Sequence, residues 1–133
     1  MIATPLDADL GDSVRLLAAE VPATARPGDT VPLTWTFEAR DLVESGWKLF
    51  VHVEGPTRNY VNGDHTPARP FEWWKPGQII RYTTTVTLPR NAPRGRYTVR
   101  IGMFKGTTRA KASSARAKIE DNAVAAATFE VVP

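Results

Sequence analysis

Apolar and polar residues alternate along much of this chain, and a period of two predicts β-strands. In residues 31–38 the apolar positions are Val31, Leu33, Trp35 and Phe37, and mostly Thr and Glu lie between them. The same period recurs in three later segments, residues 47–54, 79–88 and 96–103. One side of each strand is therefore expected to be buried. Trp35 and Trp47 fall on the buried side and are predicted to lie in the core.

Other segments are less regular. Residues 13–22 form a candidate first strand, although "VRLLAAE" could also make a short helix. The last strand is expected at "AATFEVV", residues 126–132. The polar segment 105–120, between the strand at residues 96–103 and the last strand, fits either a helical turn or a long hairpin arm. Residues 1–9 are expected to be a flexible N-terminal extension.

The turns between these strands indicate a fold class. Strands at 10–15-residue spacing with Gly and Pro between them favour an all-β sandwich. Tyr97 follows a Pro93-Arg94-Gly95 turn, which is typical of the tyrosine corner of Greek-key sandwiches. We therefore predict one domain, residues 1–133, with an immunoglobulin-like Greek-key fold of about seven to eight strands. Tyr97 and Gly95 are expected to be structural, and Pro32 should mark a sheet edge or a bulge.

Composition excludes several classes of protein. The chain has no cysteine, so it has no disulfide, zinc–thiolate site or cysteine nucleophile. No window approaches the roughly 20 apolar residues of a membrane-spanning helix. The first twenty residues carry three aspartates and no basic residue before Arg15, so they are not expected to be a signal peptide.

Charge is unevenly distributed along the sequence. Residues 1–72 carry 6 basic and 11 acidic residues, residues 73–119 carry 11 basic and no acidic residues, and residues 120–133 carry 3 acidic and no basic residues. Two interpretations remain open: internal pairing between neighbouring segments, or a positive surface that contacts a polyanion.

The segment "YVNGDHTPARPFEWW", residues 60–74, holds the candidate site. Asn62-Gly63 is a strong type I′ turn signal, so Tyr60 to His65 is predicted to form a tight hairpin tip. Asp64 would then orient the His65 ring or cap backbone N–H groups.

Metal and catalytic chemistry find little support in the chain. His52, Asp64 and His65 are the one conceivable set of metal ligands, and their spacing lacks a zinc signature, so no metal and no cofactor is expected. No serine lies in a Gly-x-Ser-x-Gly elbow. We therefore predict that the chain is not an enzyme.

Adjacent tryptophans suggest a ligand surface. Trp73 and Trp74 cannot point the same way if the segment is extended, so one should be buried and the other open. An open indole with its neighbours would give a sugar ring a stacking platform. The candidate ligand-binding residues are Tyr60, Asp64, His65, Arg69, Trp73 and Trp74, with Phe71 as a further platform neighbour. The alternative is that Trp74 anchors the loop to the sandwich. No nucleic-acid-binding module is visible, so no nucleic acid is expected as a partner.

Several motifs occur in an order that resembles a known family. They are the Phe50-Val51-His52 strand followed by Asp64-His65, the Trp74-x-Pro76-Gly77 turn, and the Pro93-x-Gly95-x-Tyr97 corner. This order resembles the β-sandwich modules attached to bacterial membrane glycosyltransferases of the dolichyl-phosphate-mannose protein mannosyltransferase type, and found in other envelope proteins. The similarity covers about Leu10 to Val132.

The resemblance implies an immunoglobulin-like accessory unit outside the cytoplasmic membrane, in the periplasm or at the cell surface, without catalytic residues. Our leading hypothesis is a non-catalytic binding or interaction module that contacts a glycan or another polyanion. The alternatives are a structural spacer that docks neighbouring domains of a larger envelope protein, and a small metal-dependent hydrolase.

Overall fold

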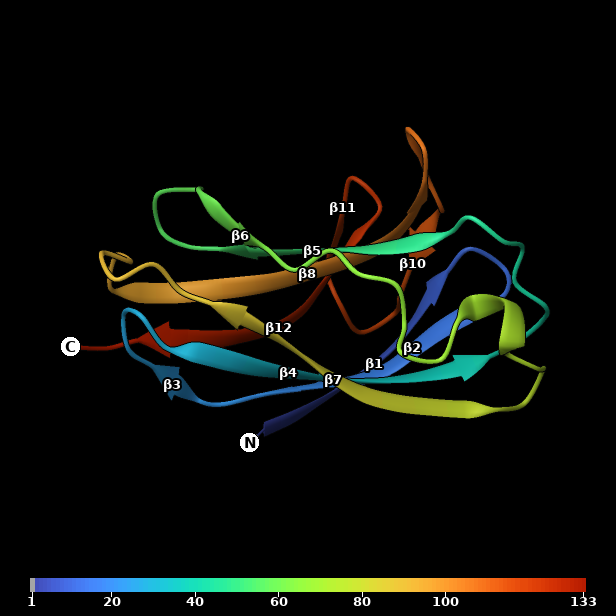
Figure 1. The fold of residues 1–133 in the computed structure, drawn as a ribbon, viewed down its shortest axis with the longest axis horizontal. Coiled ribbons are helices and arrows are strands. Elements are labelled where there is room, and N and C mark those ends of the chain that lie inside the picture. Colours follow the sequence, from blue (N-terminus) through green and yellow to red (C-terminus); the bar gives the residue numbers. More distant parts are fainter. Residues whose placement is uncertain (1) are drawn as a thin grey trace.

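Two β-sheets pack face to face in the computed structural model, which describes residues 2–133 and their side chains from Thr4 onward (Figure 1). Within that range the chain forms twelve strands, one short 3-10 turn, η1 (Phe71–Trp73), and no α-helix. The predicted all-β sandwich is confirmed. Seven strands have seven or more residues and form most of the two sheets. The other five have only two or three residues each and extend the pairing of the long strands.

The first sheet has the strand order β10-β1-β2-β4-β7. Its strands are β10 (Ala112–Ser113), β1 (Ile2–Leu10), β2 (Val14–Val21), β4 (Thr30–Ala39) and β7 (Ile79–Thr87). The second sheet has the order β11-β12-β8-β5-β6, with β3 paired to β12 and β9 paired to β8. Its strands are β11 (Ile119–Glu120), β12 (Ala123–Val131), β8 (Gly95–Lys105), β5 (Lys48–Glu54), β6 (Tyr60–Asn62), β3 (Thr24–Ala25) and β9 (Thr108–Arg109).

The prediction of a flexible extension at residues 1–9 is wrong for the described residues. They form most of β1, which pairs antiparallel with β2 along its length. Leu6, Ala8 and Leu10 are buried on its inner side. The pairing with β2 shifts between Pro5 and Ala8, which marks a bulge, but the buried positions keep a period of two across it.

The "VRLLAAE" segment is a strand for a similar reason. β2 changes register against β4 between Leu16 and Ala18. Val14 and Leu16 are buried before this bulge, and Ala19 and Val21 after it. The break in alternation explains why a short helix was also compatible with this segment of the sequence.

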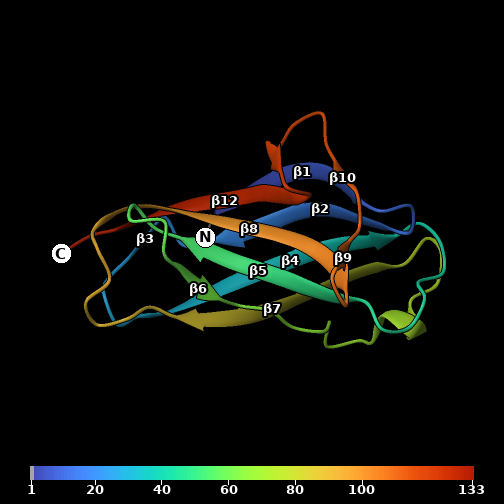
Figure 2. The same ribbon diagram turned by 90° about the horizontal axis from the view of Figure 1, so that it is seen from above.

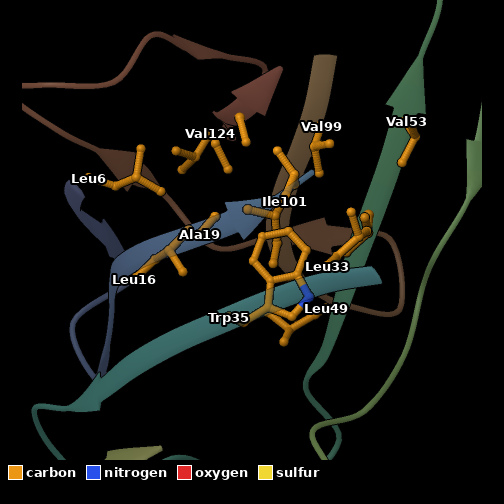
Figure 3. Close-up of a cluster of buried hydrophobic side chains, with 14 of the residues drawn as sticks. Leu6, Leu16, Ala19, Leu33, Trp35, Leu49, Val53, Val99, Ile101 and Val124 are labelled. Carbon is orange, nitrogen blue, oxygen red and sulfur yellow. The ribbon is translucent and has the colours of Figure 1, made fainter. Parts of the chain in front are cut away.

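The core lies between the two sheets, and Figure 3 shows side chains from both sheets converging on Trp35. Trp35 is fully buried, and its indole N–H donates to Thr84 Oγ1 at 3.0 Å. Its predicted place in the core is therefore observed. Trp47 lies just before β5 and is only half-buried against the core.

Threonine hydroxyls pair between β4 and β7 on the outer face of the first sheet, where Thr34 is buried although this face was expected to be open. Thr34 and Thr83 hydroxyls pair across β4 and β7 at 2.8 Å, and Thr30 and Thr87 at 3.1 Å. Pro32 pairs with Thr85 of β7 but lies beyond Thr34, the last position of β4 that pairs with β2. A residue without an N–H is tolerated there because the strand has a partner on one side only.

Residues 105–120 form a strand-bearing arm and contain no helix. The chain turns back from β8 into β9, crosses to the first sheet as β10, and returns to the second sheet as β11. The arm therefore covers the sandwich edge at which β1 and β12 lie (Figure 2).

A tyrosine corner fixes the start of β8. The Tyr97 hydroxyl donates to the Pro93 carbonyl at 2.7 Å, and its ring stacks on Phe129 with centroids 5.6 Å apart. Gly95 has φ +127°, and a Cβ there would come within 2.9 Å of Pro56. The geometry expected of Tyr97 and Gly95 from the sequence is present.

We expect Tyr97→Phe to destabilise the fold by about 0.5–1.5 kcal/mol, because it removes one hydrogen bond and keeps the ring. Urea unfolding followed by tryptophan fluorescence measures this change. A loss above about 3 kcal/mol would show that the hydroxyl does more than close the corner.

Candidate functional site

Residues 60–74 run along one edge of the sandwich, between β5 and β7 (Figures 1 and 2). The segment begins as β6, continues beside β5 through an isolated antiparallel bridge between His65 and Leu49, and ends in η1. It therefore adds pairing to the edge strand of the second sheet and closes the gap to the first.

The predicted hairpin tip at Asn62-Gly63 is wrong. The reversal between β5 and β6 occurs at residues 55–59, where Gly55 N–H donates to Asn59 O and Arg58 has φ +66°. Neither Asn62 nor Gly63 has a positive φ. Gly63 lies instead in a crowded place: a Cβ there would lie 3.0 Å from Val86 in one sheet and 3.1 Å from Val51 in the other.

Asp64 acts as a backbone cap. Its Oδ1 accepts the Val51 N–H at 2.9 Å, while its own N–H donates to Asn62 Oδ1 at 2.7 Å. Of the two roles expected for Asp64, capping N–H groups is therefore observed, whereas the His65 ring is held by other groups.

His65 ties the segment to the first sheet. Its Nδ1 lies 2.9 Å from the Gly63 carbonyl and its Nε2 lies 2.7 Å from the Tyr82 hydroxyl on β7. A carbonyl only accepts, so Nδ1 carries the proton and Nε2 accepts from the Tyr82 hydroxyl. Burial raises the pKa of Tyr82, which keeps that donor protonated.

The environment of His65 favours the neutral imidazole. Burial lowers its pKa below the ordinary 6.5, and the Gly63 carbonyl and Asp64 oppose this shift without cancelling it. Both ring nitrogens are hydrogen-bonded within the protein. His65 therefore links the second sheet, where its backbone pairs with Leu49, to Tyr82 in the first sheet.

The conceivable metal set does not come together. His52 Nε2 lies 3.9 Å from Asp64 Oδ1, while His65 is committed to Gly63 and Tyr82. No group of three His, Cys, Asp or Glu side chains in the described part of the chain is arranged to hold a metal ion. The pKa of His52 is lowered mainly by burial, and the positive charge of Arg109 lowers it further.

Trp74 is the anchor of the segment. It is fully buried, packs at 4.7 Å from the Phe71 ring and 5.6 Å from the Phe37 ring, and donates its indole N–H to the Arg69 carbonyl at 2.9 Å. Arg69 itself is exposed. The chain is a 3-10 turn here, and it still places the two adjacent indoles on opposite sides.

Trp73 is the open indole, with 65% of its surface exposed. It stands between Trp74 and Phe71, which is only 2% exposed, so its backbone is held from both sides. Tyr60 is 52% exposed but begins β6, toward the other end of the edge from η1 (Figures 1 and 2). The structure therefore does not bring Phe71 and Tyr60 into one open platform with Trp73.

An aromatic row crosses the outer face of the second sheet, and sequence reasoning missed it. Tyr60 stacks on His52 with ring centroids 4.1 Å apart, and His52 lies 5.3 Å from Phe50. Phe50 is buried beneath the Arg109 guanidinium, which lies 4.1 Å above its ring. The mixed outer face of residues 48–54 was the available signal, because it indicates cover by another segment.

A groove of about 260 Å³ lies beside this row. It opens between the β5–β6 turn and the β7–β8 connection, and its lining includes Tyr60, Asn59, Asn91 and Tyr97. These residues come from two parts of the chain more than thirty positions apart, so only the sheet pairing shows that they meet.

The uneven charge is partly absorbed by pairing. Four arginines of the basic segment lie within 4 Å of carboxylates outside it: Arg81 with Glu20, Arg96 with Glu130, Arg100 with Glu54, and Arg116 with Asp7. Among the described residues the other seven basic side chains of that segment have no carboxylate within 4.0 Å.

Comparison with known proteins gives no assignment: no protein-family model matches the chain, and no curated protein matches its sequence. Among residues 2–133, no helix is long and apolar enough to span a membrane.

The two tryptophans should differ in their effect on stability. Trp74→Ala should cost about 3–5 kcal/mol because it removes a fully buried aromatic side chain, whereas Trp73→Ala should change stability by about 0.5 kcal/mol or less. Thermal unfolding of both variants tests this. Equal losses would contradict the assignment of Trp74 as the anchor.

Stability should fall below about pH 6.5. A His65 pKa lower in the folded than in the unfolded chain means that the unfolded chain binds more protons, so the contribution is complete above pH 6.5 and is lost as the pH falls toward the folded value. Urea unfolding at about pH 8 and about pH 5 measures the loss, and His65→Gln should reduce it. A variant with the wild-type pH dependence would contradict this role of His65.

Proposed function

We propose that this chain is a non-catalytic binding module that contacts a glycan through Trp73. The observation that carries the proposal is the contrast within the edge segment. Internal contacts occupy the side chains of Asp64, His65 and Trp74. Trp73, by contrast, exposes 65% of its surface on a turn that is held by the buried side chains of Phe71 and Trp74.

A fixed, open indole suits the C–H face of a pyranose ring, because the ring stacks without first being ordered. Exposed polar side chains are close in sequence for hydrogen bonds to hydroxyl groups: Arg69, Glu72 and Lys75. The proposal includes an immunoglobulin-like Greek-key topology and a place outside the cytoplasmic membrane, which rest on the family resemblance.

The same contacts favour a second candidate function. His65 and Asp64 join the edge segment to both sheets, and rigid closure of this kind also suits a spacer that docks neighbouring domains of a larger envelope protein. A spacer needs the anchor Trp74 and has no use for a ligand at Trp73.

The deciding experiment measures binding of wild type and Trp73→Ala to an array of neutral and acidic oligosaccharides. We expect Trp73→Ala to lose about tenfold or more in affinity for the saccharides that wild type binds, with an unchanged melting temperature. Leu42→Ala is a matched control because Leu42 is 67% exposed but lies in the β4–β5 connection and lines a different cavity from Arg69.

Absence of binding across the array would reject the glycan proposal and favour the spacer. Wild-type affinity in Trp73→Ala would place any observed binding elsewhere on the molecule and would equally reject Trp73 as the contact.

A further inference from the structure

We propose that the groove beside Tyr60 is a separate binding site for an acidic sugar residue, a hexuronate unit of a saccharide. The proposal goes beyond the Trp73 contact and does not depend on it. The β5–β6 turn and the β7–β8 connection form the two walls, at the opposite end of the sandwich from η1 (Figures 1 and 2).

The floor of the groove is rigid. Tyr97 lies there and is fixed by its hydrogen bond to Pro93 and by stacking on Phe129. A Cβ on Gly55 would come within 2.7 Å of the Tyr97 ring, so the β5–β6 turn rests directly on that ring. A site whose walls and floor are already ordered spends little binding free energy on organisation.

The lining has the composition of a sugar site. Tyr60 offers a half-open ring that is held in place by stacking on His52, 4.1 Å away. Asn59, Asn91 and Thr57 supply amide and hydroxyl groups that both donate and accept hydrogen bonds. The volume of about 260 Å³ is near the lower end of small-molecule pockets, which suits one sugar ring.

Charge selects an acidic sugar over a neutral one. Arg58 lies between two lining residues of the first wall, and Arg90 and Arg94 lie next to lining residues of the second. All three are exposed and, among the described residues, have no carboxylate within 4.0 Å. Arginines next in sequence to both walls, and without a carboxylate partner among the described residues, can pair with the carboxylate of a bound hexuronate, because guanidinium and carboxylate groups form two parallel hydrogen bonds.

The test titrates the protein with trigalacturonate, maltotriose and inorganic phosphate, and follows both affinity by calorimetry and backbone amide resonances by NMR. We expect saturable binding of trigalacturonate, with shifts at Asn59, Tyr60 and Asn91, and at least about tenfold weaker binding of maltotriose. Raising the salt from about 50 to about 500 mM should weaken the trigalacturonate complex.

Variants separate the contribution of the arginines from that of the Tyr60 ring. The double variant Arg58→Gln/Arg90→Gln should lose about tenfold in affinity for trigalacturonate and most of its preference over maltotriose. Tyr60→Ala should weaken both sugars. The double variant Arg81→Gln/Arg116→Gln is the charge-matched control, because Arg81 pairs with Glu20 within the first sheet and Arg116 pairs with Asp7, and it should keep wild-type affinity.

Three results would overturn the proposal: equal affinity for maltotriose and trigalacturonate, phosphate that competes with trigalacturonate and causes the same shifts, or trigalacturonate shifts at η1 in place of the groove. The last result would support the Trp73 contact and reject only the groove. Unchanged trigalacturonate affinity and unchanged groove shifts in Trp73→Ala would have the opposite meaning, because they would show that the groove binds the acidic sugar without Trp73.

Discussion

A sandwich of two sheets buries its inner faces easily, but its open edges leave backbone groups and apolar side chains exposed to water. Most irregular segments of this chain cover those open edges. Residues 60–74 cover the edge at β5 and β7, and the 105–120 arm covers the edge at β1 and β12. Gly63 is small enough to pass between Val51 and Val86, and the His65 imidazole then reaches Tyr82 in the opposite sheet.

The sequence predicted what local patterns determine. Alternation identified β4, β5, β7 and β8, and the Pro-x-Gly-x-Tyr order identified the corner at Tyr97, because both depend on residues close together in the chain. Reasoning failed where pairing shifts by one residue. The bulge in β2 disrupts the period of two, so that segment was also compatible with a helix, whereas β1 was missed although Leu6, Ala8 and Leu10 alternate along it.

The candidate site was only partly visible for a related reason. Opposite exposure of Trp73 and Trp74 follows from their being neighbours, but which indole is buried depends on the contacts of Trp74 with Phe37 and Phe71. Asn62-Gly63 has the residues of a tight turn, but Gly63 instead passes between Val51 of one sheet and Val86 of the other. That position depends on the spacing of the two sheets. The groove at Tyr60 joins turns far apart in the chain, and such proximity has no signature in a single sequence.

Closure of the β5 edge also bears on how copies of this chain behave toward one another. Gly63 donates to Val51 O, Asp64 accepts from Val51 N, and His65 exchanges both backbone hydrogen bonds with Leu49. A molecule in which this segment lifts away would present those groups as an unpaired strand edge, on which a second copy can add a strand. The hydrogen bond between His65 and Tyr82 keeps this segment in place and so opposes self-association. Acid conditions that weaken this hydrogen bond would promote aggregation before complete unfolding.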